Sequence, residues 1–182
     1  MNKIIVVTVM LFSGLLGACK KDKPVAENVY GNGPKTTVPA SMQGNWMYGS
    51  FSMTEYWNQN PMEYIGNGLE MALAFKLNAN GTYDQYFTYS TVSGGVATYH
   101  QSLTKGTIEI NEGTKTLITH ANWSHYKETK KGQTTADRDL TASEITKVTN
   151  YTYEEKTEPN GTKAIYMTMN GTPEALPFLQ RF

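Results

Sequence analysis

Alternating apolar and polar residues constrain the fold of this chain more than any other feature. In the segment 69–77, apolar residues occupy every odd position, whereas Glu70 and Lys76 lie between them. A period of two places successive side chains on opposite faces of a β-strand, so one face is buried and the other meets water. The turn residues 78–81 (Asn-Ala-Asn-Gly) then lead into a second alternating segment, 82–89. Together the two segments predict a β-hairpin.

The same pattern continues along the chain and predicts an all-β protein. Alternating segments also occur at 97–103, 108–110 and 117–123, and the segments 145–155 and 163–170 form a further hairpin across a Glu-Pro-Asn-Gly turn. With a long opening strand over 44–57, this gives about eight strands, the number that closes into a small barrel. Short connections imply antiparallel neighbours, so we expect an up-and-down barrel. An open two-sheet sandwich built from the same strands is the alternative.

Two stretches are predicted to lie outside the barrel strands. The polar stretch Glu128–Asp139 interrupts the alternation, and we expect a rim loop there. Near the C-terminus, Thr172 and Pro173 are typical of a helix start, but Pro177 leaves room for barely one turn. We expect the apolar residues of the C-terminal tail, which include Phe178, Leu179 and Phe182, to pack back onto the barrel.

The N-terminus has the features of an exported and lipidated protein. Residues 1–18 combine the basic Lys3, an apolar run over 4–12 and small residues. The apolar run is shorter than the roughly 20 residues that a membrane-spanning helix needs, so we interpret 1–18 as a signal peptide. The sequence Leu-Gly-Ala-Cys at 16–19 resembles the lipobox of bacterial lipoproteins. That resemblance implies acylation at Cys19, with palmitate among the acyl chains.

Several expectations follow from this N-terminus. Cys19 is the only cysteine, so no disulfide can form within the chain. Residues 19–40 contain Pro and Gly residues without an apolar period, which is typical of a flexible tether, and residues 41–182 form the folded domain. We expect the protein in the cell envelope, held by its lipid on the outer membrane of a Gram-negative bacterium. The side of that membrane stays open.

The composition excludes several functions and points to none in particular. The chain carries 16 Lys+Arg and 16 Asp+Glu, so it lacks the net basic charge of a nucleic-acid binder. The sequence has no P-loop, nucleophile elbow, His-Glu-x-x-His helix or dinucleotide fingerprint. On a regular strand, His120 and His125 would face opposite sides unless a bulge intervenes, and His100 falls on the polar side of its strand. We therefore expect no enzyme activity, no metal site and no cofactor.

The opening of the domain resembles a known family. Gly44-Asn45-Trp46 matches the Gly-x-Trp that opens lipocalins, and the segment 75–83, which ends in Asn-Gly-Thr-Tyr, is similar to the second hairpin of lipocalin-like (calycin-type) bacterial lipoproteins. The resemblance implies structural roles for Gly44 and Trp46, with the tryptophan at the barrel floor. It also implies that the segment 58–68, with Met62, Tyr64 and Ile65, is a lid over the open end; the equal alternative is a surface loop whose apolar residues rest on the barrel rim.

A supply of soft and aromatic side chains on the predicted inward positions suggests a pocket for an apolar or amphipathic ligand. The predicted lining residues are Met71, Phe75, Phe87, Tyr89, Tyr99, Trp123, Met167 and Met169. An equal alternative is that these residues fill the barrel, which would then dock another envelope protein or a glycan through the loops 58–68 and 128–139. A weaker alternative is a hydrolase that uses a carboxylate pair. The leading hypothesis is a membrane-anchored protein that binds a small ligand without catalysis.

Overall fold

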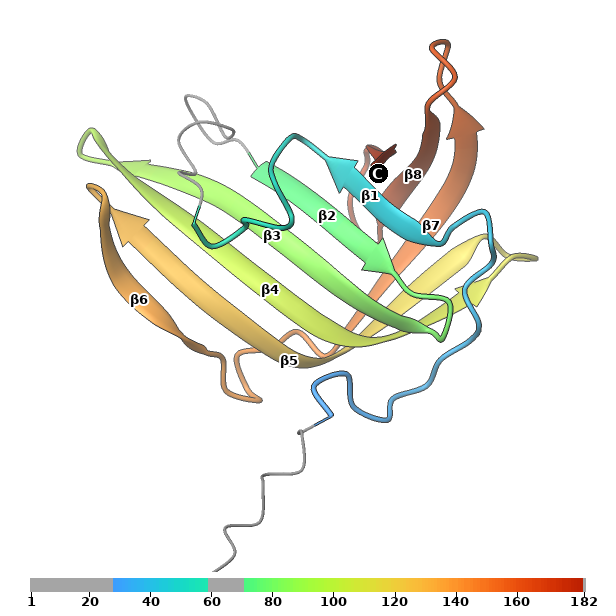
Figure 1. Cartoon of the computed structure of the whole chain (residues 1–182), viewed down its shortest axis with the longest axis horizontal. Coiled ribbons are helices and arrows are strands. Elements are labelled where there is room, and N and C mark those ends of the chain that lie inside the picture. The colour runs from blue at the N-terminus through green and yellow to red at the C-terminus, as the bar shows by residue number, and fades with distance from the viewer. Residues whose placement is uncertain (1–27, 59–70, 182) are drawn as a thin grey trace, which may run out of the picture.

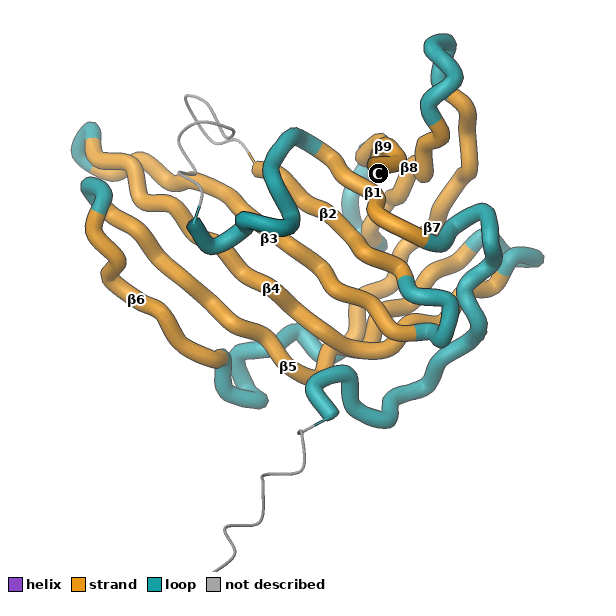
Figure 2. The backbone as a smooth tube through the Cα atoms, in the orientation of Figure 1, coloured by secondary structure: helices purple, strands orange, loops and turns teal. Residues whose placement is uncertain are grey.

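The computed structural model describes residues 28–58 and 71–181, and every regular element in those ranges is a β-strand (Figures 1 and 2). The nine strands are β1 (Gly44–Tyr48), β2 (Met71–Leu77), β3 (Thr82–Ser93), β4 (Val96–Asn111), β5 (Thr116–Lys130), β6 (Gln133–Asp139), β7 (Val148–Thr157), β8 (Lys163–Met169) and β9 (Leu176–Arg181).

These strands form one antiparallel sheet that closes on itself. Their order is β4-β3-β2-β1-β9-β8-β7-β5-β6, and a further pairing between β4 and β5 completes the ring. The described part of β6 pairs only with β5, so the ring itself contains the other eight strands. This confirms the predicted all-β, antiparallel up-and-down barrel and excludes the open sandwich. Closure also gives each ring strand a hydrogen-bonded neighbour on both sides.

The edge of β5 that faces away from β4 is shared by two successive strands. β6 pairs with residues 125–130 of β5, and β7 pairs with residues 116–120. The segment 140–147 leaves the sheet between these two pairings and returns to it at Lys147, whose carbonyl accepts from the Ala121 N–H. β6 and β7 therefore act as one long barrel strand with an insertion at its middle (Figure 1).

The structure corrects the predicted rim loop at 128–139. These residues form the end of β5 and all of β6, joined by a tight turn at Lys131 and Gly132. Both turn residues have positive φ, 52° and 74°, which is the conformation that fits the twist of a two-residue hairpin. The polar sequence did not break the strand, because β6 is exposed and needs no apolar face.

The first and last strands also differ from the prediction. The opening strand ends at Tyr48 and does not extend to Trp57, because Gly49 has a φ of 90° that turns the chain out of the sheet. At the C-terminus, residues 176–181 form β9, which pairs with both β1 and β8 and so closes the ring. The predicted segments 97–103 and 108–110 are parts of a single strand, β4.

A β-bulge in β5 decides which of its side chains face inward. The pairing with β4 skips Asn122, because Gly106 lies opposite Ala121 and Lys105 lies opposite Trp123. One extra residue reverses the alternation beyond that point. The inward positions are therefore Leu117, Thr119 and Ala121 before the bulge, but Ser124, Tyr126 and Glu128 after it.

The hydrophobic core fills one end of the barrel. Phe75 lies at its centre, with ring centroids 5.5 Å from Phe178, 6.1 Å from Tyr151 and 6.3 Å from Tyr83. Trp46 is 1% exposed, and its indole N–H donates to the Met42 carbonyl at 2.7 Å. Burial of several large side chains stabilises this end, since each contributes roughly 1.5–3 kcal/mol.

Two segments cover the outside of the barrel. Residues 28–40, which we expected to belong to a flexible tether, lie along it: the Thr36 N–H donates to the Ile108 carbonyl, and Val38 is 1% exposed in the core. The segment 51–57 covers the convex face of the sheet, where the Tyr56 hydroxyl donates to the Phe87 carbonyl at 2.7 Å. The Lys127 ammonium donates to the Trp57 carbonyl at 2.8 Å.

Candidate functional site: a cavity inside the barrel

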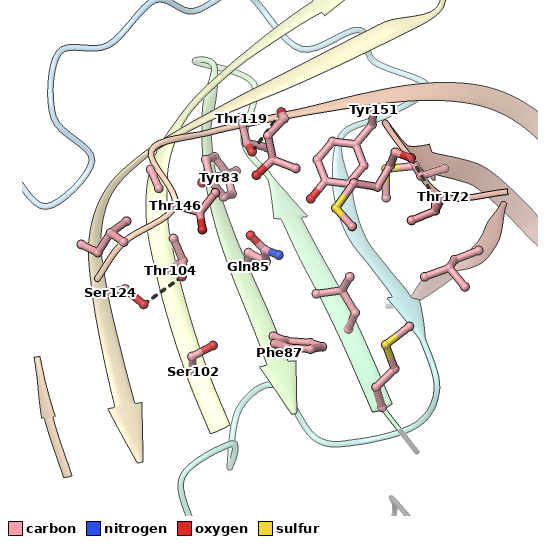
Figure 3. A pocket seen from close by; sticks show the side chains of 18 of the residues that line it. Tyr83, Gln85, Phe87, Ser102, Thr104, Thr119, Ser124, Thr146, Tyr151 and Thr172 are labelled. Atoms are coloured by element: carbon pink, nitrogen blue, oxygen red, sulfur yellow. Dashed lines mark hydrogen bonds between the residues drawn. The ribbon is translucent and has the colours of Figure 1, made fainter. Parts of the chain in front are cut away.

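The end of the barrel that the core does not fill contains a cavity of about 650 Å³ (Figure 3). Its floor is the upper layer of the core, because Leu73, Tyr83, Tyr151, Met167 and Phe178 belong to both. Its walls come from β2 to β5 on one side and from β7 to β9 on the other. The volume is within the range of roughly 300–1,000 Å³ that small-molecule sites occupy.

One wall of the cavity carries uncharged hydrogen-bonding groups. Three adjacent strands, β3, β4 and β5, place the side chains of Gln85, Ser102, Thr104, Thr119 and Ser124 on the lining. Figure 3 shows Gln85 beside Thr104 and Ser102, and the hydroxyls of Thr104 and Ser124 are 2.9 Å apart. Hydroxyl and amide groups both donate and accept, so this wall can bind a polar face of either kind. We call these five residues the polar wall.

The opposite wall is apolar. Side chains from β2, β8 and β9 contribute Met71, Leu73, Met167, Met169, Leu176 and Phe178. Methionine adapts its shape to an apolar ligand, and three of these six residues are methionines. Met71 is 39% exposed although it lines the cavity, which places it at the open end. We call these six residues the apolar wall.

The phenols at the floor are neutral donors. Burial raises the pKa of Tyr151 to about 12 and also raises the pKa of Tyr83. Both hydroxyls therefore keep their protons at physiological pH. They can hydrogen-bond to a ligand but do not carry charge.

The segment 140–147 forms part of the lining through Leu140, Glu144, Ile145 and Thr146. Glu144 fixes its shape: one carboxylate oxygen accepts from the Thr141 N–H at 2.8 Å, and the Arg138 guanidinium donates to both oxygens at 2.9 and 2.6 Å. The hydrogen bond from Arg138 is the main reason that the pKa of Glu144 falls to about 2. The carboxylate stays ionised and paired.

Beyond the cavity, a row of rings continues along the concave face. Tyr89 stacks on Phe87 and on His100, with centroids 5.2 Å and 4.4 Å apart. His100 Nδ1 lies 2.7 Å from the Tyr126 hydroxyl, which donates to Glu128 at 3.0 Å. Burial lowers the pKa of His100 more than the nearby Glu128 raises it, so the imidazole is neutral near neutral pH.

The structure places four of the eight predicted lining residues on the cavity: Met71, Phe87, Met167 and Met169. Phe75 faces inward but lies in the core below the floor. Tyr89 lies on the concave face, in the row of rings beside the cavity.

Two predicted lining residues lie on the outside of the barrel. Trp123 follows the bulge, so its ring points outward, and its indole N–H donates to Asp139 at 3.0 Å. Tyr99 alternates with Ser102 and Thr104 along β4, which puts it on the convex face. The prediction that Trp123 and Tyr99 line the cavity is thus wrong. His100 is the reverse case, because it was expected on the polar side and lies on the concave face.

The bulge also changes the placement of the other two histidines. His120 precedes it and His125 follows it, so both lie on the outer face. There the Glu109 carboxylate accepts from His120 at 2.6 Å, and the Asp137 carboxylate accepts from His125 at 2.7 Å. Within residues 28–58 and 71–181, no three His, Cys, Asp or Glu side chains are arranged to hold a metal ion.

Other predicted site residues lie outside the described ranges: Cys19, Met62, Tyr64 and Ile65. Gly44 and Trp46 are described, and they lie at the start of β1, where Gly44 has a φ of 109° and Trp46 is buried. No helix in the described part of the chain is both long and apolar enough to cross a membrane.

Sequence reasoning missed the polar wall and the segment 140–147. One signal was present for each. In β4, Ser102 and Thr104 have the same parity as the buried Ile108 and Ile110, so a single uninterrupted strand would have placed both hydroxyls inward. In the segment 140–147, Thr141-Ala-Ser-Glu144 fits the pattern of a capping box, which indicates an ordered turn.

The fold and this site define an antiparallel β-barrel with an internal amphipathic cavity. Comparisons with protein-family models, with curated proteins and with solved structures give no match to the chain.

Proposed function

We propose that this protein is a lipid-anchored cell-envelope protein whose barrel binds a small apolar or amphipathic ligand without catalysis. The observation that carries the proposal is the cavity of about 650 Å³, closed at its floor by the core and lined by one polar and one apolar wall. A barrel filled by its own side chains would leave no such space, since eight strands enclose room for either side chains or one small ligand.

Binding without reaction is favoured by the chemistry of the polar wall. Its hydroxyls and amide have no histidine or lysine among the described lining residues to activate them. Glu144, an ionised carboxylate on the lining, is bound to Arg138 and Thr141. The polar wall and Glu144 can therefore orient a ligand, but they do not supply an activated nucleophile.

The lipid anchor rests on the N-terminal sequence. The signal-peptide features of residues 1–18 and the lipobox-like residues before Cys19 support it, as does the similarity of Gly44-Asn45-Trp46 to lipocalin-like lipoproteins. Metabolic labelling with an alkynyl palmitate in a Gram-negative host tests this part. We expect labelling of the wild-type chain and none of Cys19→Ser; equal labelling of both would refute acylation at this cysteine.

Ligand uptake is tested on the protein without its acyl chains, delipidated and then exposed to an envelope extract, with native mass spectrometry as the readout. We expect a bound small molecule on the wild type and none on Ser102→Trp, whose indole would occupy the cavity. Trp123→Arg is the matched control, because its side chain lies on the outer face, and it should bind as the wild type does. Uptake that survives in a folded Ser102→Trp variant would show that the cavity is not the site.

A further inference from the structure

The charges around the cavity restrict the ligand that it can bind. The described lining residues include no Lys, Arg or His, whereas two of them, Glu144 and Glu174, are acidic. A ligand in this cavity therefore finds no positively charged partner among these groups.

Arg138, a basic residue close in sequence to the lining segment 140–147, is already neutralised. Arg138 precedes the segment 140–147 and makes two hydrogen bonds to the Glu144 carboxylate, at 2.9 and 2.6 Å. A bidentate pair of this kind satisfies both the charge and the planar geometry of the guanidinium. An anionic ligand would have to displace Glu144, which would then be left without its partner.

An anionic head group is unfavourable at both ends of the cavity. Deep inside, between the polar wall and Tyr151, it would lose its hydration without gaining a counter-ion, which costs several kcal/mol. At the rim it would face the carboxylates of Glu144 and Glu174, which are both exposed to solvent. The Glu174 carboxylate repels an anion, and the Glu144–Arg138 pair gives the anion no attraction because its two charges cancel.

An uncharged polar head group finds hydrogen-bonding partners in the cavity. The five residues of the polar wall, labelled in Figure 3, offer donors and acceptors along β3, β4 and β5, and the apolar wall from β2, β8 and β9 lines the rest of the cavity. A molecule with hydroxyl, carbonyl or amide groups on one side and hydrocarbon on the other can satisfy both walls at once. Such pairing matters, because a polar group that is buried without a partner loses its hydrogen bonds to water and gains none in return.

Building on the proposed function, we infer that the ligand is an uncharged amphiphile and that the cavity discriminates against anionic amphiphiles such as fatty acids and phospholipids. The discrimination comes from the acidic rim and from the absence of a free cation on the described lining. The binding energy comes from the two unlike walls.

Three probes with the same acyl chain test the inference: 1-monolaurin, laurate and methyl laurate, titrated into the delipidated protein at neutral pH by calorimetry. We expect monolaurin to bind most tightly, methyl laurate less tightly, and laurate about tenfold or more weaker than monolaurin. Laurate that binds as tightly as monolaurin would overturn the inference while leaving the proposed function intact. If none of the three binds while the protein still takes up a ligand from the envelope extract, the inference alone is overturned; if it takes up none, the proposed function fails as well.

Two variants assign the selectivity to named groups. Glu144→Gln removes a carboxylate from the rim and frees Arg138, and its amide oxygen can still accept from Thr141. We expect the preference for monolaurin over laurate to fall about tenfold in this variant. Glu154→Gln is the matched control, since Glu154 is exposed on β7 beside Lys156 and away from the lining, and it should keep the wild-type preference. An unchanged preference in Glu144→Gln would overturn the role of the acidic rim.

The second variant, Gln85→Met, keeps the size of the side chain and removes its amide from the polar wall. We expect weaker binding of monolaurin, by about tenfold, with unchanged binding of methyl laurate, which has no hydroxyl to lose. Equal losses for both probes would show that the polar wall does not recognise the head group.

Discussion

Gly106 is the residue on which the barrel's inner surface depends most directly. It lies on β4 opposite the bulge in β5, where the two backbones approach closely. A Cβ at this position would overlap the His120 carbonyl oxygen and lie 2.9 Å from the Ala121 Cα. Glycine is required there by this close approach and not by its φ, because both atoms are backbone and cannot move aside.

We therefore expect Gly106→Ala to lower the free energy of unfolding by about 1–3 kcal/mol or more, as overpacking against rigid neighbours does. Denaturant unfolding followed by tryptophan fluorescence measures the change. Gly113→Ala is the control, because its nearest neighbour would be the Asn111 side chain at 3.4 Å, and it should be close to neutral. Equal stability of both variants would mean that the close approach at the bulge is absent.

Two histidines are predicted to titrate on opposite sides of their ordinary pKa of about 6.5. Burial lowers the pKa of His100. Burial also acts to lower the pKa of His125, but hydrogen bonds from this ring to Asp139 and Asp137 outweigh it, and the net pKa is raised. His125 therefore stabilises the fold below its unfolded pKa and loses this contribution as the pH rises through its folded value. His100 has the opposite sign. Its contribution to the stability of the fold is present above its unfolded pKa and is lost as the pH falls through its folded pKa.

Nuclear magnetic resonance of the imidazole protons across this pH range measures both values. We also expect His125→Gln to lose more stability at acidic than at alkaline pH, by about 0–1 kcal/mol, because Asp137 and Asp139 are largely exposed. His100→Gln should show the reverse, with a larger loss of stability at alkaline than at acidic pH. If the two rings titrate at the same pH, the buried environment of His100 and the carboxylate partners of His125 do not shift their pKa values in opposite directions.

At the scale of elements, the segment 28–40 acts as an additional edge contact of the barrel. The Ile110 N–H donates to the Thr36 hydroxyl at 2.8 Å, and Val38 fills the core end. Within the described residues, the segment 28–40 is therefore held against the barrel and is not a free tether.

Thr36→Val is expected to lower the stability by about 1–3 kcal/mol, because it leaves the Ile110 N–H without its acceptor. Thermal unfolding and hydrogen exchange at Ile110 measure the effect, and faster exchange should be confined to this part of β4. Thr37→Val is the matched control, since Thr37 is exposed and lies one position further on. A Thr36→Val variant with normal exchange at Ile110 would indicate that the segment is not attached at this point.

For the whole molecule, β9 is the strand that turns a sheet into a barrel. It pairs with β1 on one side and β8 on the other. Its Phe178 side chain faces the core and packs against the rings of Phe75 and Tyr48. Without this strand, the core end would be open between the first and last hairpins.

We expect Phe178→Ala to cost about 3–5 kcal/mol, as large-to-small changes in cores do. Leu179→Ala, on the opposite face of the same strand, should cost less, because Leu179 is only partly buried. Denaturant titration compares the two, with near-ultraviolet circular dichroism as a measure of tertiary packing. Similar costs for both would show that β9 does not close the core.

Much of the fold could be predicted from the sequence. The alternation in 69–77 and 82–89 gave β2 and β3 with the correct inward face, and turns such as Asn78–Gly81 gave the antiparallel order. β6 and β9 were missed for one reason: their sequences carry no clear alternation. β6 is exposed and needs none, and β9 contains Pro177, which the structure tolerates opposite Tyr166.

The cavity was less predictable than the barrel. Met71, Phe87, Met167 and Met169 could be found, because they follow the alternation of regular strands. Trp123 could not be placed, since one unpaired residue, Asn122, reverses the direction of every side chain after it.

The sequence by itself determined the all-β class, most of the strands and their antiparallel order, because these depend on local periodicity and turn chemistry. The tertiary structure alone decided the strand that closes the ring, the direction of the side chains beyond the bulge and the survival of a cavity above the core. These depend on how distant strands pair and on how much volume their side chains leave, and neither quantity is a property of any one segment.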